Sequence, residues 1–393
     1  MQLSSRYQQL PEYTFDRLRV LLGDSAPYTN RVIDMSMGEP NHEFPRFITD
    51  EILNSVQQFG KYPPRNGTRD LRNAITNWLQ RRYKVELDPE KNIIATNGSR
   101  EGLFNACVAL CPDAQNGKQV RVLIPNPFYQ VYAGAAVAAN AVPKYINAIE
   151  ETDYLPDFGA LSKNDWDTIS IVYLCSPSNP QGSIASLNFL KNLMNLAAEH
   201  DFVVFSDECY SEIYRELPPP SMLQTLSEEG IDTERMLVFN SLSKRSNLPG
   251  LRVGFMAGGP RIITQLKKYR SYSDPGIPIP LQNIATKLWA DEDHVVQSRQ
   301  RYRVKYQLSD QILGNLNGYS PPQGGFFLWI KVPDGEKVTL ELWQNKGIKV
   351  IPGAYFSRDV NGINPGTEFI RVALVADEPE LKVGLQGLKE VLQ

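Results

Sequence analysis

Four polar segments each follow a short apolar, β-rich run of the sequence. They are residues 126–129 (N-P-F-Y), 176–180 (S-P-S-N-P), 206–210 (S-D-E-C-Y) and 241–244 (S-L-S-K). In open α/β sheets ligands bind beyond the carboxyl ends of the strands, so segments in this position are expected to meet at one site. Together they offer an aromatic face, an amide, a carboxylate followed by a phenol, and an amine among hydroxyls.

Lys244 is the candidate for covalent chemistry in this set. A free lysine has a pKa of about 10.4, so its amine is mostly protonated and non-nucleophilic at neutral pH. It needs a carbonyl partner and neighbours that lower its pKa. A lysine in a polar loop is most often solvated surface, and only the surroundings of Lys244 favour a catalytic role.

Pyridoxal phosphate (PLP) is a ligand that would use every group in these segments. It has an aldehyde for the amine, a ring nitrogen that pairs with a carboxylate, a phenolic oxygen, a flat face and a phosphate. Residues 97–100 (N-G-S-R) stand between the apolar run 93–95 and an apparent helix, and free N–H groups at a helix start bind phosphate. Ser241, Ser243 and Arg252 can add further donors.

Purely structural roles for the same residues stay open. Asp207 could cap a helix, and Tyr129 and Tyr210 could be ordinary half-buried tyrosines. The nucleotide-binding patterns G-x-G-x-x-G and G-x-x-x-x-G-K-[ST] are missing, which weakens a dehydrogenase or P-loop interpretation. The four cysteines lack C-x-x-C spacing and the three histidines are dispersed, which disfavours structural disulfides and a metal site.

The elements that must position these residues read as an α/β sheet. Apolar runs predict buried strands, and residues 186–200 carry apolar side chains at helical spacing between two of them. A strand, helix, strand order implies a right-handed parallel crossover. The roughly ten residues between Asn240 and Leu251 are too few for such a crossover, so the strands on either side should be antiparallel neighbours. The predicted strands are residues 120–124, 169–174, 202–205, 236–239 and 253–257.

After about residue 275 the pattern changes. Helical stretches are predicted over residues 281–289 and 299–313, and strands over 326–332 and 369–374. These elements indicate a smaller α+β domain. A short N-terminal helix is predicted around Phe15, Leu18 and Leu22.

Length and composition agree with a folded protein of two or three domains. The chain has 393 residues with 41 basic and 44 acidic side chains, so no overall positive charge favours nucleic acid. Its apolar stretches fall short of the roughly 20 residues of a membrane span, and the first thirty residues lack the apolar core of a secretory signal. We therefore expect neither nucleic acid nor a membrane as a partner, and a cytoplasmic location.

Six motifs occur along the chain in a recognisable order and spacing. They are M-G-E-P at 37–40, Y-P-P-R-N-G at 62–67, S-N-P-Q-G at 178–182, D-E-C-Y at 207–210, S-L-S-K-R-S-N-L-P-G-L-R at 241–252 and F-I-R-V-A at 369–373. Through these motifs nearly the whole chain resembles the fold-type I PLP-dependent aminotransferases (class I/II), the aspartate aminotransferase superfamily. The stretches 206–214 (S-D-E-C-Y-S-E-I-Y) and 241–247 (S-L-S-K-R-S-N) look most like the succinyldiaminopimelate aminotransferase branch.

The resemblance implies a fold and a division of the chain. A large domain would hold a mostly parallel seven-stranded sheet with one antiparallel strand, sandwiched by helices, beside a smaller α+β domain. Residues 1–45 would form an N-terminal arm and part of the small domain, residues 46–275 the large PLP-binding domain, and residues 276–393 the small C-terminal domain.

The resemblance also implies a role for each site residue. Lys244 would bind the cofactor covalently and then shuttle a proton, while Asp207 would pair with the pyridine nitrogen. Arg371, which needs an anionic partner if buried, would bind the substrate carboxylate with help from Gly38 and Asn179. Tyr210 and Asn179 would hold the phenolic oxygen and Tyr129 would stack on the ring. The expected phosphate ligands are Ser99, Arg100, Ser241, Ser243, Arg252 and, from a second subunit, Tyr62.

The implied activity is transamination by a homodimer with shared active sites. The substrates would be N-succinyl-LL-2,6-diaminopimelate and 2-oxoglutarate, in lysine and diaminopimelate biosynthesis. Alternatives are an aminotransferase for aspartate, alanine or aromatic amino acids, a PLP-dependent lyase, and a regulator on the same scaffold. Departures from the branch at residues 270–276 and 324–325 are expected to line the side-chain pocket, whereas Ser178 in place of glycine should be tolerated.

Overall fold

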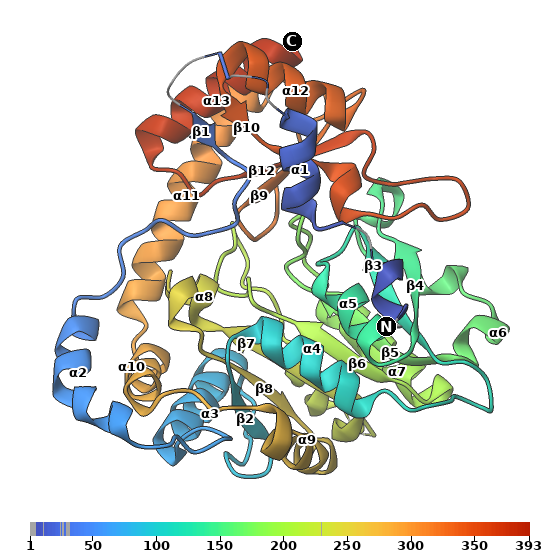
Figure 1. Ribbon diagram of the computed structural model, residues 1–393, viewed down its shortest axis with the longest axis vertical. Helices are drawn as coiled ribbons and strands as arrows, with labels where there is room; N and C mark the ends of the chain where they lie inside the picture. Colours follow the sequence, from blue (N-terminus) through green and yellow to red (C-terminus); the bar gives the residue numbers. More distant parts are fainter. Residues whose placement is uncertain (1–4, 11, 24, 26, 29–31, 229) are drawn as a thin grey trace.

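A seven-stranded sheet forms the centre of the larger domain (Figure 1). The computed structural model describes residues 5–10, 12–23, 25, 27–28, 32–228 and 230–393. Within the sheet, β8 runs antiparallel to both of its neighbours and the other pairs are parallel, which confirms the predicted fold class. The strand order is β2 (Ile93–Thr96), β8 (Gly254–Gly258), β7 (Met236–Ser241), β6 (Val203–Asp207), β5 (Ile169–Cys175), β3 (Arg121–Asn126) and β4 (Val142–Asn147).

The reversal of β8 follows from the short connection that precedes it. Residues 242–253 contain only the four-residue helix α8 (Leu242–Arg245) and a single 3-10 turn before the chain pairs back on β7. Ser241 is paired with Gly254, so the whole connection stays at one edge of the sheet. A side chain at Gly254 would collide with the carbonyl of Asn240, which explains glycine at this close approach.

Helices cover both faces of the sheet, and the alternation of each strand assigns its side chains to the two faces. On one face Ile94, Ile171 and Tyr173 pack with α4 (Ser99–Leu110), α5 (Val131–Ala138) and α9 (Pro260–Ser273). On the other face their neighbours in sequence pack with α3 (Arg69–Tyr83), α7 (Leu187–His200) and α10 (Ile279–Ala290). Burial on both faces explains why the strands read as continuous apolar runs.

The smaller domain is built on a three-stranded antiparallel sheet in the order β11 (Ile351–Pro352), β12 (Phe369–Ala373) and β9 (Phe327–Lys331). The N-terminal segment joins this domain, because β1 (Ile33–Asp34) pairs with β10 (Ile348–Lys349) and α1 (Thr14–Leu22) buries Leu18 and Leu22 against Trp329. The smaller domain also contains α12 (Gly335–Lys346) and α13 (Glu378–Leu392), whereas α2 (Phe47–Ser55) and α6 (Lys163–Trp166) pack with the core of the larger domain.

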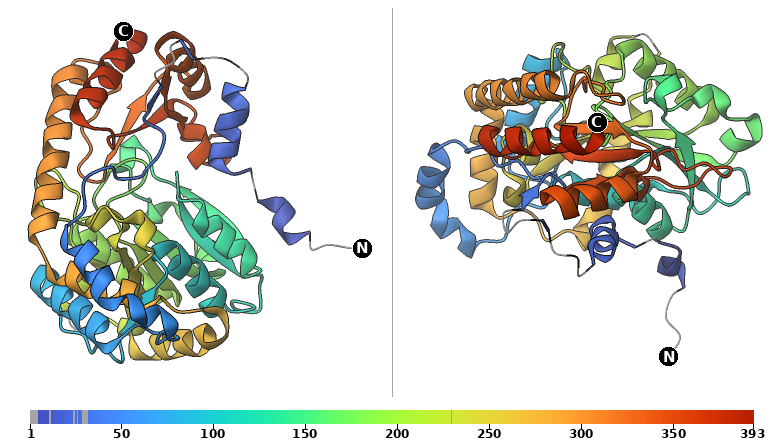
Figure 2. Two further views of the ribbon diagram at one scale, coloured as in Figure 1. Left: turned by 60° about the vertical axis from the view of Figure 1, so that its left-hand side comes forward. Right: turned by 90° about the horizontal axis from the view of Figure 1, so that it is seen from above.

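The long helix α11 (Asp293–Leu313) extends from the larger domain into the smaller one (Figures 1 and 2). The preceding helix, α10, buries Leu288 and Trp289 with Trp78 in the core of the larger domain. The boundary expected at residues 275/276 stays a prediction, and this packing places α10 with the larger domain. Among the described residues, no helix combines the length and apolar character that a membrane span requires.

Candidate active site

A cavity of about 670 Å³ lies where the polar segments that follow the strands meet the smaller domain. Most of the predicted site residues line it, although they come from widely separated parts of the chain. They are Gly38, Ser99, Arg100, Tyr129, Asn179, Asp207, Tyr210, Ser243, Lys244, Arg252 and Arg371. Its charged wall residues are four basic side chains and one acidic side chain, so the cavity suits a ligand with several negative charges.

Lys244 lies in α8 with its amine inside the cavity wall. Its Nζ donates to the carbonyl of Gly38 and lies 5.1 Å from the ring centre of Phe326. Burial lowers the pKa of Lys244 to about 8, and the cations Arg371 and Arg252 act in the same direction. The amine is therefore far more available as a nucleophile and base near neutral pH than a free lysine.

Asp207 ends β6 and is a buried carboxylate, 5% exposed. Its Oδ2 accepts a hydrogen bond from the Tyr132 hydroxyl at 2.7 Å, and its Oδ1 accepts from the backbone N–H of Cys209 at 3.3 Å. Burial raises the pKa of Asp207. No basic side chain of the described residues forms a salt bridge with it, so a cationic ring nitrogen would offset the cost of its burial.

The aromatic side chains expected at the cofactor ring are also in the wall. Tyr129 packs edge-on against Tyr132 at 5.7 Å, and its hydroxyl accepts from Nε of Arg100 at 2.7 Å. Tyr210 lies three residues after Asp207 and contacts Phe326 edge-on at 5.3 Å. Burial raises the pKa values of both phenols, so both stay protonated at neutral pH.

The residues expected to bind phosphate gather at the start of α4. Gly98 has φ +78° and a side chain there would collide with the guanidinium of Arg252, so the loop needs glycine to bring that cation close. Arg252 donates to the carbonyls of Pro249 and Asn97 at 2.8 and 3.0 Å. A helix start beside a guanidinium and the Ser243 hydroxyl is a fitting cradle for a phosphate.

Arg371 comes from β12 of the smaller domain and is only 4% exposed. It donates to Asn179 Oδ1 at 3.1 Å and to the carbonyl of Ser36 at 2.7 Å, while its Nε has no partner. Burial lowers the pKa of Arg371 to about 10, which still leaves it charged at neutral pH. No carboxylate of the described residues pairs with it, so the guanidinium is suited to an acidic ligand.

Two predicted cofactor residues are not in the cavity wall. Ser241 is fully buried behind Ser243, to which its hydroxyl lies at 2.9 Å, so it supports the wall from behind. Tyr62 is completely exposed in a single chain, and its expected role in a second subunit stays a prediction.

The segments expected to shape the side-chain pocket do not line the cavity. Arg270 is buried in a cluster with Glu101 and Asp274, and Asp274 accepts from Asn97 at 2.9 Å, so this segment supports the loop before α4 instead. Gly324 packs on Pro177 and Ile213. The wall residues that sequence reasoning missed include Tyr13, Thr14, Phe15, Phe104, Gln130, Cys175, Cys209, Phe327 and Phe356.

The groups in the cavity fit PLP on three independent grounds. A buried carboxylate and a buried guanidinium both lack a charged partner, a helix start faces a cationic side chain, and a lysine has a lowered pKa. Each is the protein half of an interaction that a different part of PLP or of its amino acid substrate would complete.

Comparisons with known proteins agree with this arrangement. The model of the family "Aminotransferase class I and II" matches residues 30–388. The chain is 30% identical to a putative aminotransferase, AatC, of Rhizobium meliloti, over 98% of this chain and 95% of that protein. It is 29% identical to an LL-diaminopimelate aminotransferase of Dehalococcoides mccartyi, over 99% of this chain and 98% of that protein.

Solved structures show the same likeness. An aminotransferase from Neisseria meningitidis superposes with a TM-score of 0.95 at 34% identity, over the full length of both chains. The aminotransferase AspB from Helicobacter pylori superposes with a TM-score of 0.91 at 35% identity, over 98% of this chain and 99% of that one. The chain therefore belongs to the class I and II aminotransferases, a family of PLP-dependent enzymes.

Proposed function

We propose that Lys244 is the catalytic base of this aminotransferase, that Asp207 binds the cofactor ring and that Arg371 binds the substrate. The observation that carries the proposal is their convergence in one cavity: an amine with a lowered pKa, a buried acid without a cation and a buried cation without an acid. When bound, PLP supplies a conjugated ring that accepts the electron pair released at the substrate Cα.

Each residue then has a defined task. Arg371 holds the substrate α-carboxylate through its planar fork, aided by the Asn179 amide that already contacts it. Asp207 keeps a proton on the ring nitrogen, which strengthens the ring as an electron acceptor. The amine of Lys244 takes the proton from the substrate Cα, and its pKa near 8 suits a base at neutral pH.

Borohydride reduction of the PLP-loaded enzyme, followed by peptide mass spectrometry, tests the role of Lys244. A pyridoxyl adduct is expected on the peptide that contains Lys244. The matched control is Lys305, a second buried lysine whose pKa burial also lowers to about 8, but which bonds the carbonyl of Val375 outside the cavity wall. An adduct on Lys305, or an active Lys244→Ala variant, would overturn the proposal.

For the substrate, we propose N-succinyl-LL-2,6-diaminopimelate with 2-oxoglutarate as the amino acceptor. The resemblance of residues 206–214 and 241–247 to that branch supports it. So does the surplus of basic side chains in the cavity, because this substrate carries several carboxylates beside the cofactor phosphate. Arg100 lines the cavity together with Arg371 and offers a second cation.

LL-diaminopimelate without the succinyl group is a second candidate, favoured by the names of several full-length relatives. Aspartate, alanine and aromatic amino acids complete the set. The PLP-loaded enzyme is assayed with each donor and 2-oxoglutarate, and kcat/KM ranks them. Negligible turnover of the succinylated donor beside rapid turnover of another would remove the first choice. Release of ammonia and a 2-oxo acid without an acceptor would indicate a lyase.

We also propose that two copies of the chain form a homodimer in which Tyr62 reaches the partner's phosphate site. The support is a group of exposed apolar side chains before Tyr62, which a single chain leaves open to water. They are Phe44, Leu53, Val56 and Phe59. Light scattering is expected to give twice the chain mass, and Tyr62→Phe is expected to weaken PLP binding about tenfold, the loss of one hydrogen bond to a charged group. A monomer with full activity would contradict this.

A further inference from the structure

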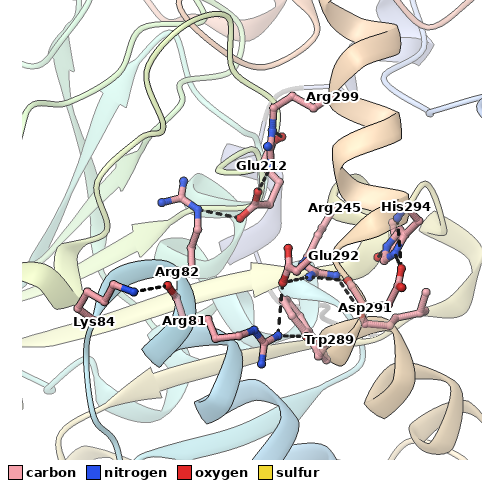
Figure 3. Close-up of polar contacts among 12 residues, drawn as sticks. Arg81, Arg82, Lys84, Glu212, Arg245, Trp289, Asp291, Glu292, His294 and Arg299 are labelled. Carbon is pink, nitrogen blue, oxygen red and sulfur yellow. Dashed lines mark hydrogen bonds and ion pairs between the residues drawn. The ribbon is translucent and has the colours of Figure 1, made fainter.

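The three residues that follow Lys244 each reach the same part of the molecule, the junction between α10 and α11. Arg245 makes the largest set of contacts (Figure 3). Its Nη1 donates to the carbonyl of Leu288 at 2.6 Å, and its Nη2 donates to the carbonyl of Asp291 at 3.2 Å and to Glu292 Oε1 at 2.9 Å. Leu288 is in the last turn of α10, where carbonyls lack partners within the helix, so Arg245 caps that helix end.

Arg245 is also enclosed by aromatic rings. Its side chain is fully buried, and the guanidinium carbon lies 4.9 Å from the ring centre of Trp289 and 5.6 Å from that of Trp78. A desolvated cation over aromatic faces is held by attraction to the rings as well as by its hydrogen bonds. Successive helical residues point about 100° apart, so Arg245 can enter the core while Lys244 faces the cavity.

Ser246 continues the connection through a histidine. The Ser246 hydroxyl lies 2.8 Å from Nε2 of His294, and Nδ1 of the same ring is hydrogen-bonded to Asp291 (Figure 3 shows His294 and Asp291). This Ser–His–Asp order is that of a hydrolytic triad. Ser246 has no exposed surface, however, and none of the three residues lines the cavity, so a substrate cannot reach its hydroxyl. The chain of hydrogen bonds is therefore structural.

Asn247 makes the third contact. Its Nδ2 donates to the hydroxyl of Ser298 on α11 at 3.1 Å, and its backbone has φ +54°, a conformation that asparagine adopts more readily than most residues. Three successive side chains thus contact three successive parts of the junction: the end of α10, the first turn of α11 and the second turn of α11.

We propose that Arg245, Ser246 and Asn247 form a three-point clamp that fixes the turn carrying Lys244 and thereby aims its amine. They are positioning residues, and the inference rests on the proposed role of Lys244. A four-residue helix cannot hold its own shape, and a lysine side chain is flexible, so the direction of the amine must be set by contacts from outside the turn.

Helix α11 also anchors a second part of the site. Glu212, two residues after Tyr210, pairs with Arg299 of α11 at 2.5 Å and with Arg82 of α3 at 3.0 Å (Figure 3). Further along α11, Lys305 donates to the carbonyl of Val375, just beyond the strand that carries Arg371. The segments that carry Lys244, Tyr210 and Arg371 are therefore all connected to α11 by hydrogen bonds or ion pairs.

The test compares full-length Arg245→Lys and Ser246→Ala with Arg215→Lys. Arg215 is the matched control because it also ties a loop to α11, through Asp310, but at the far end of the helix. In PLP-free protein, acetic anhydride labels Lys244 across a pH series, and mass spectrometry follows it against the exposed Lys163. In PLP-loaded protein, kcat and KM are measured with the best donor.

Loosening the turn is expected to admit water to the Lys244 amine. The labelling midpoint should then rise by about one pH unit in the clamp variants, because partial resolvation restores a lysine pKa. kcat should fall about tenfold with KM nearly unchanged, the signature of a misplaced reacting group rather than lost binding. Arg215→Lys should lose stability to a similar degree and change neither value.

An unchanged midpoint and kcat in Ser246→Ala and in any folded Arg245→Lys protein would overturn the clamp. If Arg245→Lys does not fold, Ser246→Ala decides alone, because it removes a single hydrogen bond. A pyridoxyl adduct on a lysine other than Lys244, after borohydride reduction of the PLP-loaded enzyme, would overturn the role of Lys244 itself, which separates the two failures.

Discussion

Two buried arginines of this chain sit in opposite circumstances. Arg245, behind the lysine, has carbonyls, a carboxylate and two indole rings around its guanidinium. Arg371, in the cavity, has an amide, a carbonyl and two phenyl rings, but no acidic partner among the described residues. A buried cation is retained either because the fold satisfies it or because a ligand does. This difference supports the proposal that Arg245 has a structural role and that Arg371 binds the substrate.

The largest expected effect is the loss of catalytic efficiency when Arg371 is substituted. Arg371→Leu should lower kcat/KM about a thousandfold, since two charge-assisted hydrogen bonds to a carboxylate are lost at roughly 2 kcal/mol each. The PLP-free protein should lose little stability, because removal of a buried charge without an acidic partner offsets the loss of its hydrogen bonds to Asn179 and Ser36. Steady-state kinetics and urea unfolding check both parts. A variant that keeps its activity would remove the basis of the comparison.

Arg245→Leu should show the reverse order of effects. We expect the free energy of unfolding to fall by about 3 kcal/mol, because two helix-end carbonyls and Glu292 lose their donor and the indoles lose the cation. Urea unfolding of PLP-free protein measures this directly. A loss of stability smaller than that of Arg371→Leu would contradict the distinction.

Lys244 is a third, largely buried cation, and its burial should make the stability of the protein depend on pH. Its pKa is about 8 in the folded protein against an ordinary value of 10.5, so the unfolded chain binds the proton more tightly. Stability should therefore rise as pH increases from 8 to 10.5, and the full penalty applies below pH 8. PLP-free Lys244→Met should be more stable than the unaltered protein at pH 7 by about 2 to 3 kcal/mol.

The pH series of unfolding midpoints provides the check on Lys244→Met. The stability gained by Lys244→Met should shrink above pH 8. Lys163→Met, which replaces an exposed lysine, is the control and should show no such pH dependence. A constant advantage across the series would mean that burial of the amine carries no charge penalty.

The smallest expected effect concerns the hydroxyl that bonds Asp207. Tyr132→Phe removes a 2.7 Å hydrogen bond to this carboxylate and should weaken PLP binding or slow turnover about tenfold. Tyr173→Phe is the matched control: Tyr173 stacks on Tyr132 at 4.4 Å, but its hydroxyl bonds the carbonyl of Leu103 instead. Equal effects of the two variants would show that Tyr132 acts only through packing.

The sequence was sufficient to predict the sheet, because both of its faces are buried and its strands are apolar throughout. It did not reveal β4, whose Pro143, Lys144 and Asn147 give the mixed polarity of an edge strand. Nor did it indicate that α10 packs with the larger domain, since an apolar helical stretch does not state which core it joins.

Within the site, residues in polar loops were found because their types are unusual at strand ends. Tyr132 was missed because a tyrosine in an apolar stretch resembles ordinary core, and Cys209 was missed because a cysteine without a metal-binding or disulfide spacing resembles a small apolar residue. One signal could have exposed Tyr132: it follows Tyr129 by three residues, a spacing that puts both phenols on one side of a helix start. Residues 270–276 were expected to line the side-chain pocket and do not, because a polar, charged segment can support a loop from behind as readily as line a pocket.

The reversal of β8 sets where this molecule tolerates engineering. A parallel crossover returns the chain to the far edge of a sheet, so extra length can be absorbed away from the ligand. The connection from β7 to β8 begins and ends at the ligand edge and contains Lys244 and its clamp. New termini made by circular permutation, or an inserted tag, should therefore be accepted at the exposed turn around residues 116–118 and rejected between residues 242 and 253.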